Sequence, residues 1–132
     1  MRIPAERQPR WAAEVGVNIT LLTPERVEGE LVARPELGNG VGILHGGALM
    51  TFADNLAGTA TMANLPEAQS ATTLESKTNF FAAVPIGDTA RGVCLPLHRG
   101  RSTQVWQSTI TRGDGKLAAI SIHTQMVIAA KA

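Results

Sequence analysis

One segment of this chain, from Gly46 to about Asn64, has the residue spacing of a helix, and the runs after it have the spacing of strands. Its apolar residues recur at intervals of three and four, the period of one helix face. They are Leu49, Phe52, Ala53, Leu56, Ala57 and Ala60. The rest of the segment's surface is also nearly uncharged, which is typical of a buried helix. The fold must therefore enclose this helix.

Period-two alternation predicts strands elsewhere in the chain. The predicted runs are 15–22, 27–34, 71–83, 88–97, 102–112 and 117–129. In the last run Ile120, Ile122, Met126 and Ile128 point one way, and Ser121, His123 and Gln125 point the other. An antiparallel sheet of about five to six strands wrapped around one central helix buries that helix best, so we expect an α+β fold.

Length and composition restrict the function classes. A chain of 132 residues suits one core, so we expect an N-terminal arm at 1–11 and a single domain at 12–132. The net charge of +1 argues against a nucleic-acid surface. Cys94 has no partner cysteine for a disulfide. Without a signal peptide or a membrane span, the expected location is the cytoplasm.

The start of the predicted helix carries two glycines, Gly46 and Gly47. The first N–H groups of a helix lack helical partners and carry the positive end of its dipole. Glycine lets a ligand oxygen approach the backbone closely, so this end suits an oxyanion hole for a carbonyl. The alternative is that the glycines only allow a tight loop-to-helix turn.

A single acid interrupts the apolar helix at Asp54. Helical spacing places Gly47, Thr51, Asp54, Gly58 and Thr61 on one small, polar stripe. A buried carboxylate needs a partner, a raised pKa or a chemical use. We therefore interpret Asp54 as a catalytic group, the alternative being a structural Asp bonded to a neighbouring hydroxyl or amide.

Helix geometry sets a condition on these two candidates. Gly46 and Asp54 are eight residues apart, which is about 12 Å along a helix. One carbonyl cannot contact both, so either they serve different purposes or the site joins Gly46 of one subunit to Asp54 of another. Two helices packed antiparallel about a twofold axis would achieve the second arrangement.

The other candidate residues are histidines and a basic turn. His45 is a general base or, as we favour, a residue that positions the Gly46 N–H. His98 and His123 are expected to be ordinary surface or edge residues, with no spacing for a metal site. Arg99, Gly100 and Arg101 form a basic turn that either binds phosphates or is simply solvated. Trp106 is expected in the core. The sequence contains no G-x-S-x-G elbow, which argues against a serine hydrolase.

The motif Asn39-x5-His45-Gly46-Gly47-x6-Asp54 resembles the active-site signature of hot-dog-fold acyl-CoA thioesterases of the phenylacetate-degradation (PaaI-type) family. The stretch from Arg91 to Gln107 also resembles relatives that hydrolyse aryl-CoA thioesters. The resemblance extends over about residues 12–129. It implies a hot-dog fold, a homodimer that completes the active site, and a homotetramer built from two such dimers.

The resemblance also implies residue roles. Asp54 would be the general base or nucleophile, and the Gly46 N–H, helped by Asn39, would polarise the thioester carbonyl. His45 would support that loop, and Thr73 would orient the water, with Thr59 and Gly58 as nearby alternatives. Residues implied for substrate or coenzyme A binding are Gly47, Arg99, Gly100, Arg101, Met50 and Phe80, with Met62 and Phe81 as further pocket candidates.

The expected activity is hydrolysis of an aryl- or phenylacetyl-type, or a short- or medium-chain, acyl-CoA, without metal or other cofactor. Asn39 and Asp54 match the phenylacetate-type pattern, whereas the aryl-CoA relatives often carry Gln and Glu there, so the acyl group does not follow. One alternative is a hot-dog hydratase or dehydratase, which would pair a catalytic histidine with the acid. The other is a non-catalytic acyl-CoA-binding protein.

Overall fold

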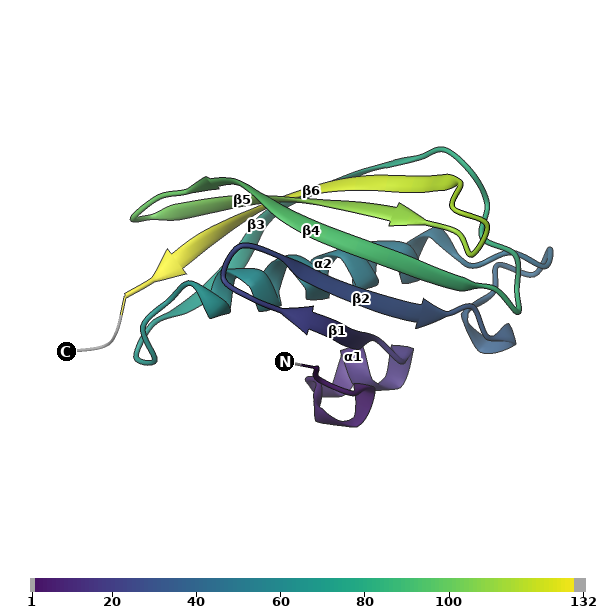
Figure 1. The fold of residues 1–132 in the computed structure, drawn as a ribbon, viewed down its shortest axis with the longest axis horizontal. Coiled ribbons are helices and arrows are strands. Elements are labelled where there is room, and N and C mark those ends of the chain that lie inside the picture. The colour runs from purple at the N-terminus through teal and green to yellow at the C-terminus, as the bar shows by residue number, and fades with distance from the viewer. Residues whose placement is uncertain (1, 130–132) are drawn as a thin grey trace.

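The computed structural model describes residues 2–129 and contains two α-helices and six strands within them. The elements are α1 (Arg10–Val15), β1 (Asn18–Leu22), β2 (Val27–Val32), α2 (Gly46–Ala63), β3 (Ser70–Phe80), β4 (Thr89–Arg99), β5 (Thr103–Thr111) and β6 (Leu117–Ile128). The strands form one antiparallel sheet in the order β1-β2-β4-β5-β6-β3. The long helix α2 lies along one face of this curved sheet (Figure 1) and contacts every strand. The predicted α+β architecture is confirmed.

The predicted apolar face of α2 is the face that packs on the sheet. All six residues of that face are buried, at 3% exposure or less. Phe52 and Leu56 lie against two paired glycines, Gly29 on β2 and Gly92 on β4. A Cβ atom at Gly92 would lie 2.6 Å from Leu56 Cδ1, so glycine is what lets the helix approach this closely. Trp106 is in the core, as predicted.

Strand β6 alternates as predicted, but its polar side faces the helix. Ser121, His123 and Gln125 are buried between the sheet and α2, whereas Met126 and Ile128 are 40% and 41% exposed. The expectation that His123 is a surface or edge residue was therefore wrong. Alternation shows which residues share a face, but which face meets the helix depends on strand neighbours far away in the sequence.

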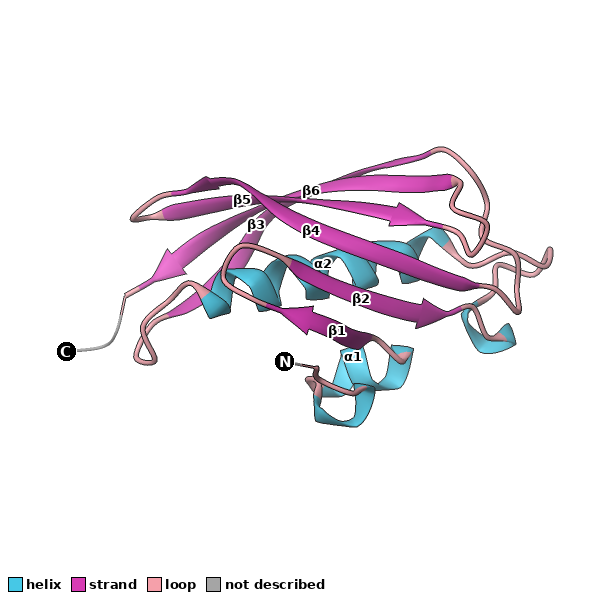
Figure 2. Cartoon of the chain, viewed as in Figure 1, coloured by secondary structure: helices cyan, strands magenta, loops and turns pink. Residues whose placement is uncertain are grey.

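The N-terminal residues form a small layer that the sequence patterns did not predict. Residues 10–15 form the helix α1, where the strand pattern had been extended back to Val15, and Gly16 ends it with a φ of 93°. Arg34 Nη1 donates to the Val15 carbonyl at 2.6 Å. Ile3 pairs with Ile19 as an antiparallel bridge. Figure 2 shows these short helical turns at the edge of the molecule, beside the edge strand β1. No helix in residues 2–129 is long and apolar enough to cross a membrane.

Candidate functional site

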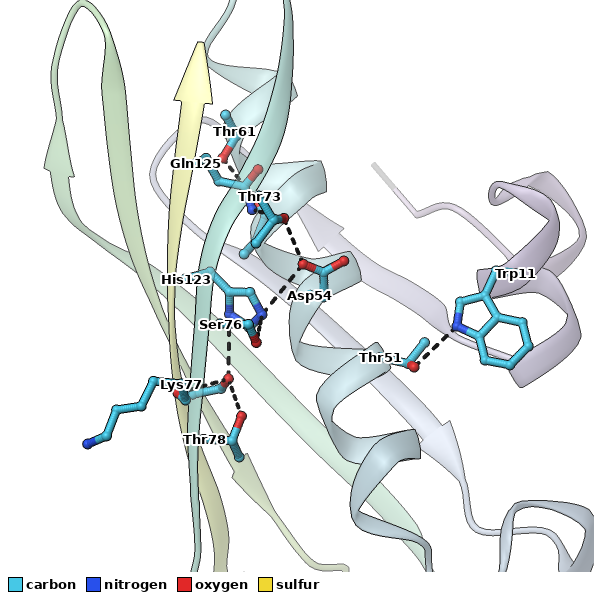
Figure 3. Close-up of polar contacts among 12 residues, drawn as sticks. Trp11, Thr51, Asp54, Thr61, Thr73, Ser76, Lys77, Thr78, His123 and Gln125 are labelled. Carbon is cyan, nitrogen blue, oxygen red and sulfur yellow. Dashed lines mark hydrogen bonds and ion pairs between the residues drawn. The ribbon is translucent and has the colours of Figure 1, made fainter.

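Asp54 lies midway along α2 and is held by side chains from the sheet (Figure 3). The Thr73 hydroxyl on β3 donates to Asp54 Oδ1 at 2.9 Å, and Gln125 Nε2 on β6 donates to Thr73 Oγ1 at 2.8 Å. Gln125 thereby fixes the direction of the Thr73 hydroxyl, whose only proton points to the carboxylate. The second oxygen of Asp54 points away from Thr73 and is left for a ligand.

The Asp54 side chain is 53% exposed in this single chain. The burial assumed from the apolar sequence around it was therefore wrong. The predicted stripe also needs one correction, because Thr61 is fully buried and donates to the Ala57 carbonyl at 2.8 Å. The exposed part of the helix surface runs from Gly47 past Asp54 to Gly58 and ends in a methionine, Met62, that is 46% exposed.

A mostly apolar cavity of about 510 Å³ opens beside Asp54. Its floor is the C-terminal half of α2, including Gly58, Thr59 and Met62. The remaining walls come from the N-terminal segment, β1, β3 and β6. Both alternatives to Thr73, Thr59 and Gly58, line this cavity, but Thr73 is the one that hydrogen-bonds the carboxylate.

At the N-terminus of α2, His45 is the N-cap residue. Its Nδ1 accepts from the Gly47 N–H at 2.8 Å, and its carbonyl accepts from the N–H groups of Ala48 and Leu49. Within residues 2–129 the Gly46 N–H has no acceptor. Of the two glycines named from the sequence, only Gly46 therefore keeps a free donor for a ligand oxygen, while His45 uses its ring nitrogen to hold the turn.

Asn39 and Gly46 share a second cavity of about 340 Å³. Asn39 Oδ1 accepts from the Val41 N–H at 3.0 Å, so its amide nitrogen is the atom left for a ligand. The Phe80 ring lies directly against Gly46, within 3.2 Å of where a Cβ atom would be. Phe81 and Leu49 complete an aromatic and aliphatic lining beside the two donors.

The structure does not bring all the candidates together in one chain. The Asp54 cavity and the Gly46 cavity have no lining residue in common, and Met50 lines neither. Arg99 lies at the far end of α2 from Gly46, where its Nη1 donates to the Pro24 carbonyl and to Asn64 Oδ1, each at 3.3 Å. Gly100 and Arg101 belong to the same turn, and Arg101 is exposed.

Sequence reasoning did not identify the residues that surround Asp54 and Thr73 from the sheet, which are His123, Ser76 and Gln125. His123 is fully buried, with Nε2 2.9 Å from Ser76 Oγ and 3.6 Å from Asp54 Oδ1 (Figure 3). Burial lowers the pKa of His123, and the nearby Asp54 carboxylate opposes that shift only in part. The available signal was the polar set Ser121, His123 and Gln125 on one face of a strand, but the sequence did not say that this face meets Asp54. Residues 2–129 contain no cluster of three or more His, Cys, Asp or Glu side chains suited to a metal ion.

Comparison with known proteins identifies relatives of this chain. A family model described as "Thioesterase superfamily" matches residues 41–119. The putative esterase Rv1847 of Mycobacterium tuberculosis is 32% identical over 110 residues, covering 81% of this chain and 78% of the relative. The proofreading thioesterase EntH of Cronobacter turicensis is 30% identical over 107 residues, covering 81% and 77%.

Solved structures agree with the fold. The structure of the same M. tuberculosis esterase aligns with a TM-score of 0.88 and 28% identity, covering 94% of this chain and 100% of that one. The PaaI protein of Escherichia coli, from the phenylacetic acid degradation operon, aligns with a TM-score of 0.86 at 20% identity, covering 93% of this chain and 87% of that one. At that identity the second alignment supports the fold alone.

Proposed function

The chain belongs to the thioesterase superfamily and is a thioester hydrolase of hot-dog fold, and we propose that it hydrolyses an aryl- or phenylacetyl-type acyl-CoA in the cytoplasm. The observation that carries the proposal is the Asp54 carboxylate, held by Thr73 through one oxygen and open to an apolar cavity through the other. The aromatic lining of the Gly46 cavity, with Phe80 and Phe81, supports an aryl group as the acyl substituent.

The proposed reaction needs only groups of this chain and water. The thioester oxygen accepts from the Gly46 N–H and the Asn39 amide, which stabilise the negative charge that develops on it. Asp54 removes a proton from water, and the hydroxide attacks the carbonyl carbon. The tetrahedral intermediate expels the coenzyme A thiolate, which takes the proton back from Asp54. Direct attack by Asp54 to form a mixed anhydride is the alternative route.

A homodimer completes this site in the proposal. Gly46 and Asp54 line separate cavities of one chain, so a carbonyl beside Gly46 needs the Asp54 of a second protomer. In the proposal the two protomers pair along strand β3, because it is an edge strand of the sheet, is eleven residues long and is almost wholly exposed. It also carries Thr73 and Phe80, so pairing along it brings two sets of site residues together.

A homotetramer is supported by the opposite face of the sheet. Apolar side chains there point away from α2, with Leu95, Leu97 and Met126 exposed by 43%, 58% and 40%. Ile120 and Ile122 lie on the same outward face of β6. Apolar surface of this kind favours a contact between two dimers through their sheets.

One observation favours a second candidate, a hydratase or dehydratase acting on acyl thioesters. That class pairs a histidine with the acid, and His123 does lie 3.6 Å from Asp54. However, its side chain is fully buried behind the carboxylate, so it cannot reach a substrate in the cavity. Hydration of an enoyl-CoA without coenzyme A release would decide for this candidate.

The direct test is thiol release from a panel of acyl-CoAs, including phenylacetyl, hydroxybenzoyl, short-chain and long-chain thioesters. We expect turnover on at least one aryl member and a loss of about a thousandfold or more in Asp54→Asn, because that change removes the base. Retained circular dichroism would show that the variant is folded. Turnover that is indifferent to Asp54 would reject the proposed role.

Subunit complementation tests the shared site. Asp54→Asn and Gly46→Pro chains are each expected to be inactive alone. If the site joins the two protomers, a refolded equal mixture should regain about a quarter of wild-type activity, because half the dimers are mixed and each holds one intact site. A mixture that stays inactive would place both residues in one chain's site.

A further inference from the structure

Behind Asp54, the sheet presents a buried imidazole that the proposed reaction does not use directly. His123 on β6 is fully buried, and its Nε2 faces Ser76 Oγ at 2.9 Å and Asp54 Oδ1 at 3.6 Å. Its other nitrogen, Nδ1, is 3.5 Å from Ser121 Oγ. Buried polar groups are expensive unless they are satisfied, and this one is satisfied by groups that also surround the carboxylate.

A β-bulge in β3 is what brings the second hydroxyl to this place. Thr73 pairs with Gln125 and Ser76 pairs with His123, and the register shifts between Thr73 and Glu75. Residues three apart in a regular strand point to opposite faces, but the extra residue, Leu74, restores both hydroxyls to the face that meets α2. Thr73 and Ser76 therefore approach Asp54 from the same side of the sheet (Figure 3).

Among the groups of residues 2–129 that face the imidazole, only one is charged. From α2 it faces the Asp54 carboxylate, and from β6 and β3 it faces only the hydroxyls of Ser121 and Ser76. From β5 its register neighbour is the apolar Trp106. The ammonium group of Lys77 points away from the site in Figure 3.

Burial therefore keeps the ring neutral near pH 7, because it lowers the pKa of His123. Two oxygens, one of them anionic, face Nε2, so the proton of the neutral ring belongs on that nitrogen.

We propose that His123 is a positioning residue for Asp54 and that Ser76 acts through it, because Ser76 Oγ contacts the His123 ring and not the carboxylate. The ring faces Oδ1, the oxygen that Thr73 also holds, so that Oδ2 is the oxygen that takes the proton from water. This inference rests on the proposed thioesterase reaction. It adds a second requirement for activity, since Asp54 must be ionised and His123 must be neutral. An imidazolium at this distance would form an ion pair with the carboxylate and compete with the water for it.

The kinetic test compares three variants across pH. His123→Gln keeps an N–H donor but cannot titrate, so we expect its kcat to stay within about tenfold of wild type. At low pH, uptake of two protons should lower kcat/KM in the wild type, and uptake of only one should lower it in this variant. His123→Leu removes the donor, and we expect kcat to fall about 10- to 100-fold with little change in KM. Ser76→Ala should lower kcat in the same way.

The control is Glu67→Gln at an exposed position before the same strand, which should leave both parameters unchanged. The proposal is overturned if His123→Leu is folded and keeps the wild-type kcat and acid limb.

A second measurement does not depend on turnover. Nitrogen NMR of the His123 ring follows its titration in the intact protein, with Asp54→Asn as the variant and the exposed Glu67→Gln as the control. Because the carboxylate raises the pKa of His123 against the effect of burial, Asp54→Asn should lower the titration midpoint, and Glu67→Gln should not. An unchanged midpoint in Asp54→Asn would overturn the pairing even in an active thioesterase. A shifted midpoint in a protein that hydrolyses no thioester would instead count against the proposed function alone.

Discussion

The Thr73 hydroxyl donates its only proton to Asp54 Oδ1, because Gln125 donates to the same hydroxyl from the other side. Thr73 therefore cannot donate to water while this network is intact. Thr73 can only accept a hydrogen bond from a bound water. That bond would direct one proton of the water toward Thr73 and leave the other for Asp54. In the proposed reaction, the network would therefore orient the base, Asp54, and Thr73 would orient the water only as an acceptor.

Replacing Thr73 by Val removes the hydrogen bond to the carboxylate and leaves the Gln125 amide without its acceptor. We expect kcat to fall about 10- to 100-fold with a smaller change in KM, as for a misplaced catalytic group. Thr73→Ser keeps the hydroxyl and should stay within a few-fold of wild type. Steady-state kinetics on the best acyl-CoA checks this pair, and equal rates for the Val and Ser variants would refute it.

The Gly46 N–H can be removed without disturbing the helix start. Proline suits the first position of a helix, and His45 already has the extended φ and ψ of −62° and 137° that a residue before proline prefers. We expect Gly46→Pro to lower kcat/KM about 100- to 1,000-fold, the usual effect of losing one oxyanion donor.

Gly46→Ala is the steric control for that experiment. It keeps the N–H but places a Cβ atom at the same point, 3.2 Å from the Phe80 ring. If Ala and Pro lose activity equally, the loss comes from crowding against Phe80 and the oxyanion assignment fails.

Arg101 tests coenzyme A binding more directly than Arg99, because Arg99 also donates hydrogen bonds to Pro24 and Asn64 and its loss would disturb the fold there. We expect Arg101→Gln to raise KM about tenfold for an acyl-CoA, since it would remove the proposed charge-assisted contact with a coenzyme A phosphate. The same acyl group on N-acetylcysteamine, which lacks the nucleotide, should show no change. Arg91→Gln, an equal loss of charge at an exposed position of β4, should behave as wild type.

The contact between α2 and the paired glycines predicts a stability effect. A methyl group at position 92 would overlap Leu56 Cδ1 and the Phe52 ring, so Gly92→Ala should destabilise the fold by about 1–3 kcal/mol. Leu56→Ala alone should cost about 2–5 kcal/mol by leaving a cavity. The double variant should cost less than the sum, because the new methyl enters the vacated space. Chemical denaturation of the four proteins measures this, and strict additivity would contradict the contact.

Burial raises the pKa of the Cys94 thiol to about 11, so the thiolate that reacts with aromatic disulfide reagents is almost absent at neutral pH. We expect no measurable thiol in the native protein and one per chain in denaturant. This outcome also means that thiol release in the activity assay comes from coenzyme A. Rapid reaction of the native protein would show that Cys94 is accessible.

The sequence by itself determined which residues of each element share a face. Intervals of three and four identified the buried side of α2, with Phe52 and Leu56, because a helix places such residues on one face whatever lies opposite. Alternation likewise separated His123 and Gln125 from Met126 on β6. The Gly46 and Asn39 candidates were also local, since both lie in the segment that leads into one helix.

Only the tertiary structure decided which faces meet. His123, Ser76 and Asp54 come from β6, β3 and α2, and the contact among them depends on strand order and on the bulge at Leu74, neither of which has a local signal. The exposure of Asp54 was decided in the same way, because an apolar sequence does not show where the sheet stops covering a helix. Local spacing follows from the covalent chain, whereas pairing between distant strands is selected by packing of the whole core.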